Sequence, residues 1–110
     1  MVVARRYEWY YILTMLDKQT VRAALVNVLR QVQETSGRPC PIITDKMKPI
    51  GELPGFDSLL AIEATVLLEQ KLACTLADGT PFISDGGTRA LRFGDIVNRT
   101  LAMMVPGGAA

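Results

Sequence analysis

The segment from Asp57 to Leu72 contains neither proline nor glycine, and its apolar residues recur at helical spacing. Asp57 and Ser58 are residue types that suit the N-terminal boundary of a helix. The apolar positions form two neighbouring stripes, namely Ala61, Ala64, Leu68 and Leu72, and beside them Leu59, Ile62 and Val66. A helix that is apolar on more than one face is either central in the core or covers one face with something outside this chain.

Two further helices are predicted on either side of it. The first follows Asp17 and ends at Ser36-Gly37, where the glycine suits a C-cap, and its apolar face consists of Val21, Leu25, Val28, Leu29 and Val32. The last runs from Phe93 to Met103, with Ile96 and Val97 on its apolar side and Arg99 free to point outward. The predicted fold class is therefore all-α.

The connections between these helices differ in length. Residues 37–56 are rich in proline and glycine, which predicts a long first loop with little regular structure. Residues 77–87 contain turn signals at Asp78-Gly79 and Gly86-Gly87 around Phe82-Ile83, which predicts a loop or a short hairpin. Long connections in small domains are often functional.

A length of 110 residues fits one compact domain, which we expect to span residues 17–104. An aromatic extension, residues 1–16, precedes it, and a flexible tail, residues 105–110, follows. Glu8 interrupts the apolar stretch of the extension, which is too short to span a bilayer, so no membrane partner is expected. The sequence leaves its role open. One interpretation is an added helix that either covers the domain or joins two copies of the chain into a homodimer. The other is that translation starts at Met15, so that the residues before it have little role.

The chain has no histidine and only two cysteines, Cys40 and Cys74. Catalysis of the Ser-His-Asp or Cys-His kind within one chain is excluded for want of its base. Two thiols without an imidazole also fall short of the four ligands of a structural zinc site. Because the cysteines lack CxxC spacing and no secretion signal is recognised, we expect reduced thiols and a cytoplasmic protein.

The formal net charge of +1 is unevenly distributed. Residues 1–49 carry a net charge of +4, residues 50–78 carry −4, and residues 79–110 carry +1. The basic residues of the first segment are scattered and not clustered into a stripe, so nucleic acid is not an expected partner. The predicted helix that begins at Ser58 lies in the acidic part.

Ser58 stands where an extended, proline-bearing loop runs directly into that helix. The start of a helix presents unpaired backbone N–H groups and a partial positive charge, so a phosphate esterified to the serine hydroxyl would meet a favourable field. For an arbitrary Asp-Ser pair, the simpler interpretation is that Asp57 or Ser58 only caps the helix.

The longer register around this serine resembles the phosphopantetheine-attachment region of acyl carrier proteins. That family carries G-x-D-S-L, a glutamate five residues after the serine, and L-E-x-x-[FL] further along the helix. This chain has Gly55, Asp57, Ser58 and Leu59, then Glu63, then Leu68-Glu69-Gln70-Lys71-Leu72. The segment Leu91-Arg-Phe-Gly-Asp-Ile-Val is similar to the start of the family's last helix, so the likeness covers about residues 17–103.

The resemblance implies an acyl-carrier-like four-helix bundle that catalyses no reaction itself. Ser58, flanked by Asp57 and Leu59, would receive 4′-phosphopantetheine from coenzyme A through a phosphopantetheinyl transferase. The arm's thiol would hold acyl intermediates as thioesters for acyl-transferring or condensing enzymes of fatty acid or polyketide biosynthesis. The same likeness makes one helix face the docking surface for these partners, formed by Leu59, Ile62, Glu63, Val66 and Glu69.

Three features depart from the family pattern. The net charge is +1 where the family is strongly acidic, Leu60 stands where an acid is frequent, and residues 77–87 suggest a third helix remodelled into a loop or short hairpin. An alternative function is an unmodified, carrier-like module for protein–protein interaction. A serine hydrolase, suggested by Phe-Asp-Ser-Leu, is excluded because the chain has no histidine.

Overall fold

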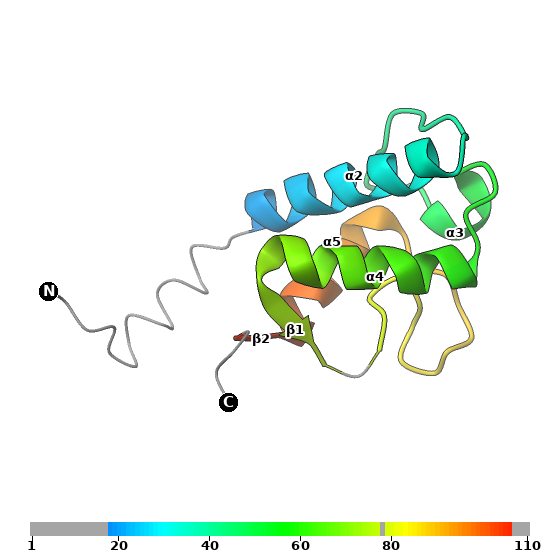
Figure 1. Cartoon of the computed structure of the whole chain (residues 1–110). Helices are drawn as coiled ribbons and strands as arrows, with labels where there is room; N and C mark the ends of the chain where they lie inside the picture. Colours follow the sequence, from blue (N-terminus) through cyan, green and yellow to red (C-terminus); the bar gives the residue numbers. More distant parts are fainter. Residues whose placement is uncertain (1–17, 78, 107–110) are drawn as a thin grey trace, which may run out of the picture.

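The computed structural model describes residues 18–77 and 79–106. Its elements, labelled as in Figure 1, are α2 (Lys18–Thr35), α3 (Pro49–Glu52), α4 (Ser58–Leu72), β1 (Cys74–Leu76), α5 (Phe93–Met103) and β2 (Met104–Pro106). The protein is mostly helical, as predicted, and contains in addition one small two-stranded sheet that the sequence did not predict. The aromatic extension and its proposed homodimer, and residues 107–110 of the tail, lie outside the described residues.

Helix α2 buries the apolar face that its sequence predicts. Val21, Leu25 and Leu29 are fully buried, and the face packs on both α4 and α5. The helix ends where Gly37 adopts a φ of +70°, a left-handed conformation that glycine accommodates without strain. The N–H of Arg38 donates to the carbonyl of Gln33 at 2.8 Å and completes this end. Arg22 is half-buried, and its guanidinium lies 5.1 Å from the ring centre of Phe93.

Helices α2 and α4 lie side by side and run in opposite directions, with α5 behind them (Figure 1). The stripe of small residues on α4 points inward, since Ala61, Ala64 and Leu68 are all fully buried. Small side chains permit close approach of the two helices, and apolar burial contributes about 25 cal/mol per Å² of surface removed from water. The helix α5 has the predicted bounds and buries Phe93 and Ile96 in the same core.

The long first connection is irregular except for α3, a single distorted turn that the sequence analysis did not predict. Pro49 stands at the first helical position, where its missing N–H costs nothing. Gly51 has a φ of +102°, so the turn cannot continue as a regular helix. The connection then turns inward at Leu53 and Phe56, which are both buried.

Between β1 and α5, the described residues form no helix, in agreement with the prediction of a loop or short hairpin. Ile83 and Ala90 form an isolated antiparallel bridge, and the N–H of Ser84 donates to the carbonyl of Arg89 at 2.8 Å. The expectation that Arg99 points freely outward is wrong. Its side chain is largely covered, and its guanidinium donates to Asp85 in this loop.

The chain leaves α5 as a strand, although a tail was expected to begin at residue 105. Strand β2 pairs antiparallel with β1, in the register Cys74 with Pro106 and Leu76 with Met104. Ala73, between α4 and β1, adopts a left-handed φ of +51° that reverses the chain. This two-stranded ribbon lies at the end of α4 opposite to the one at which that helix begins (Figure 1).

Candidate functional site

The loop that leads into α4 is anchored by two buried side chains. Leu53 and Phe56 insert into the core, and the Phe56 ring packs against that of Phe82 with a centroid distance of 5.6 Å and an interplanar angle of 54°. Gly55, between them, has a φ of +67°, and its carbonyl accepts a hydrogen bond of 2.7 Å from the Arg38 guanidinium. The backbone before Ser58 is therefore fixed by buried side chains on the core side and by the Arg38 hydrogen bond on the solvent side.

Gln33 of α2 fixes the same loop from the core. Its side chain is fully buried, and its amide nitrogen donates to the carbonyls of Pro54 at 2.8 Å and Pro39 at 3.1 Å. Both amide hydrogens are thereby used, while the amide oxygen is buried without a partner among the described residues. The sequence analysis missed this residue. Its signal was a glutamine four positions after Leu29, in register with the apolar face of α2.

Asp57 and Ser58 form the first turn of α4 as the sequence predicts. The Asp57 carboxylate accepts a hydrogen bond of 3.0 Å from the N–H of Leu60, and this bond caps the helix. Ser58, the first helical residue, is exposed, and its hydroxyl has no hydrogen-bond partner within residues 18–77 and 79–106. The cap and the serine are thus separate. Asp57 serves the backbone, and the hydroxyl of Ser58 stays accessible for chemistry from outside.

The second stripe of α4 faces solvent. Leu59, Ile62 and Val66 have exposed fractions of 73%, 56% and 48%. Glu63 lies between them and is also exposed, so the predicted docking residues from Leu59 to Val66 share one open face with Ser58. The apolar character of α4 on two faces is thereby explained, because one stripe is core and the other is surface. An exposed apolar stripe of this kind is typical of an interaction site.

Glu69, the remaining predicted docking residue, has a different environment. It is half-buried, and its carboxylate accepts a hydrogen bond of 2.8 Å from the backbone N–H of Leu76 in β1. This carboxylate therefore joins α4 to the strand. If Glu69 also contacts a partner protein, its carboxylate must do so while it accepts the hydrogen bond from Leu76.

The two cysteines, Cys40 and Cys74, are free thiols. Burial raises the pKa of Cys40 and also that of Cys74, where the nearby Glu69 carboxylate adds to the rise. A raised pKa keeps both thiols protonated and weakly nucleophilic at neutral pH. The described residues hold no group of three or more cysteine, aspartate and glutamate side chains arranged for a metal ion.

Comparison with known proteins gave no match, whether to family models, curated proteins or solved structures. Within residues 18–77 and 79–106, no helix combines the length and apolar character needed to cross a membrane. The assignment of a function therefore rests on the residues around Ser58 and on the face of α4 that they share.

Proposed function

We propose that the chain is an acyl carrier protein that holds acyl groups as thioesters on a 4′-phosphopantetheine arm attached to Ser58. The observation that carries this proposal is the free, exposed Ser58 hydroxyl at the first residue of α4, beside an exposed apolar stripe. The carrier-like bundle is part of the same proposal. It would consist of α2, α4 and α5, with the hairpin loop before α5 in place of a third helix.

The residues around Ser58 fit a phosphate ester at its oxygen. The backbone N–H groups of Ser58 and Leu59 have no partner in the described structure, and they lie at the positive end of α4. They would donate to a phosphate on the neighbouring hydroxyl. Asp57 keeps this end of the helix in place through its bond to Leu60. When bound, the arm supplies the thiol that carries the acyl group, while the chain itself supplies attachment and presentation.

The face made of Leu59, Ile62, Glu63 and Val66 would present this site to partner enzymes. A stripe of apolar side chains beside carboxylates suits transient docking to a basic surface with an apolar centre, because the charges speed encounter and the apolar contacts hold it. A phosphopantetheinyl transferase and acyl-transferring or condensing enzymes are the proposed partners. The resemblance of Gly55–Leu59, Glu63 and Leu68–Leu72 to acyl carrier proteins supports the same choice.

Intact-protein mass spectrometry tests the attachment. After incubation with coenzyme A and a broad-specificity phosphopantetheinyl transferase, the wild-type chain should gain the mass of one arm. The Ser58→Ala variant should gain nothing, and the Ser36→Ala variant, which alters an exposed serine at the end of α2, should be modified like wild type. Modification of Ser58→Ala, or none of wild type with several transferases, would contradict the proposal.

The exposed stripe alone also favours a second function, an unmodified interaction module built on the same fold. The two functions differ in what they require of Ile62. For a carrier, Ile62→Asp should slow modification of Ser58 by the transferase, while Val105→Asp, at another exposed apolar position on β2, should not. Circular dichroism must show both variants folded. If no transferase modifies the wild-type chain, the interaction module becomes the better proposal.

A further inference from the structure

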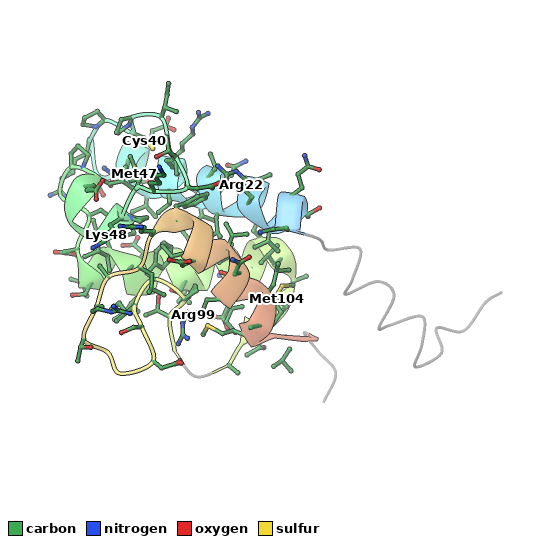
Figure 2. The ribbon with its side chains drawn as sticks, turned by 180° about the vertical axis from the view of Figure 1, so that it is seen from behind. Arg22, Cys40, Met47, Lys48, Arg99 and Met104 are labelled. Atoms are coloured by element: carbon green, nitrogen blue, oxygen red, sulfur yellow. The ribbon has the colours of Figure 1, made fainter. Side chains whose placement is uncertain are left out.

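A hollow of about 630 Å³, lined mostly by charged and polar residues, lies between the N-terminal half of α2 and the start of α5. Its lining residues come from α2, α5, the segment 45–46 and Arg92, so it is separate from the face of α4 that bears Ser58. Figure 2 is seen from this side of the molecule, with Arg22 and Lys48 on either side of the beginning of α5. Hollows of this volume are typical of small-molecule sites.

Positive side chains from three separate segments line the hollow. They are Lys18 and Arg22 of α2, Lys46 of the first connection and Arg92 before α5, against two acids, Asp45 and Asp95. Only Arg22 is neutralised, through its ion pair with Asp45. Lys18, Lys46 and Arg92 are exposed and form no ion pair within the described parts of the chain. The net charge of the lining is therefore +2.

The framework that carries these cations is held in place by hydrogen bonds. The N–H of Phe93 donates to the carbonyl of Met47 at 2.7 Å, and the N–H of Gly94 donates to that of Asp45 at 3.0 Å. Arg22 is fixed by its ion pair with Asp45 and by the face of the Phe93 ring. These bonds also use the first N–H groups of α5, so an anion here would be held mainly by side chains.

A smaller hollow of about 250 Å³ adjoins the first, because Arg92 and Asp95 line both. It adds two more cations, Lys48 and Arg89. The positive lining thus continues past the start of α5. A ligand with several negative charges along its length could contact Arg92 at the centre and lysines on either side.

We propose that this double hollow binds a compact polyanion in which two or more phosphate groups are linked. Several unpaired cations around one hollow favour multiple charge-assisted hydrogen bonds to phosphate oxygens. The lining of the larger hollow contains one apolar side chain, Val97, and no aromatic one, and Phe93 beside it is fully buried. Without an exposed ring for stacking, the site would recognise the phosphate chain and not a base.

Titration of the ¹⁵N-labelled, unmodified full chain with inorganic tripolyphosphate tests the proposal. Amide shifts should concentrate at Lys18, Arg22, Lys46 and Arg92, and inorganic monophosphate should bind more weakly. Affinity should also fall as salt is added. Shifts spread evenly over the surface, or equal affinity for monophosphate and tripolyphosphate, would overturn the proposal. So would an oligonucleotide that binds as tightly as tripolyphosphate at equal phosphate number.

Charge variants identify the site. The double variant Lys46→Gln with Arg92→Gln should weaken tripolyphosphate binding at least about tenfold, the effect of losing one strong charged contact. The control Lys71→Gln removes an exposed cation at the end of α4 and should leave affinity near that of wild type. Asp95→Asn should tighten binding, a gain that misfolding cannot mimic. An equal loss in Lys71→Gln, or no gain in Asp95→Asn, would count against the site.

This proposal is independent of Ser58. The Ser58→Ala variant should bind tripolyphosphate like wild type, so a failure of phosphopantetheine attachment and a failure of polyanion binding are separate results.

Discussion

Replacement of Gln33 by leucine should destabilise the protein by about 2 kcal/mol. The substitution keeps the approximate volume of a fully buried side chain but removes its hydrogen bonds to Pro54 and Pro39. Each such bond contributes about 1 kcal/mol net, and an acceptor left without a partner costs about 1 to 3 kcal/mol when water cannot reach it. Pro39 and Pro54 are exposed residues, so water partly replaces the lost donor. Removal of the unpaired amide oxygen offsets part of the loss.

A second variant separates hydrogen bonding from shape. Gln33→Glu is closer to glutamine in shape than leucine is, yet at neutral pH it would place a buried carboxylate opposite two carbonyl oxygens. An unpaired buried charge is strongly unfavourable, so Gln33→Glu should be less stable than Gln33→Leu, although it resembles the native residue more closely. Protonation at low pH should restore part of the difference, because a protonated carboxyl can donate one hydrogen bond.

Urea unfolding followed by far-UV circular dichroism measures these changes, with an unchanged slope of free energy against urea. The matched control is Gln31→Leu, two positions earlier on the exposed face of α2, which should stay within about 0.5 kcal/mol of wild type. A loss below about 0.5 kcal/mol in Gln33→Leu, or a Gln33→Glu variant more stable than Gln33→Leu, would refute the assigned role.

Two further predictions concern the loop before Ser58 and the pH. Gly55→Ala should cost about 1 to 2 kcal/mol in unfolding free energy, since φ is +67° and a Cβ would meet the Arg38 guanidinium. In an Arg38→Ala background, Gly55→Ala no longer meets the guanidinium but keeps the cost of the positive φ. If Gly55→Ala then caused no loss of stability, the assigned role of the φ would be contradicted. The raised pKa of Cys74 means that the unfolded chain loses its proton first, so the stability advantage of wild type over Cys74→Ala should shrink as pH rises from about 8.5 through the folded pKa. A pH-independent difference between the two proteins in urea unfolding would exclude this linkage.

The helices were predictable because their apolar residues repeat over several turns. The bounds of α5 were predicted at Phe93 and Met103, and α4 begins at Ser58 as its Asp57 cap indicates. The two-stripe pattern allowed either burial or an open face for Leu59, Ile62 and Val66, and the structure shows the open face.

What the sequence did not predict depends on contacts between distant segments. The strands β1 and β2 have three residues each, too few for a periodic pattern, and they form only because the segments that follow α4 and α5 pair with each other. Gln33 has polar character in an apolar register, and only the positions of Pro39 and Pro54 reveal what it binds. The hollow lined by cations could not be predicted for the same reason, since its cations come from segments far apart in the chain.

The ribbon of β1 and β2 links the unfolding of the two helices that it follows. A single residue, Ala73, separates α4 from β1, and β2 follows α5 directly. Pairing continues past the strands, because the N–H of Ala77 donates to the carbonyl of Met103 at 3.0 Å. Fraying of one helix end therefore breaks hydrogen bonds that protect the other. Amides at the carboxyl ends of α4 and α5 should exchange with solvent hydrogen as one cooperative unit, while amides in the first turn of α4 should exchange independently of that unit.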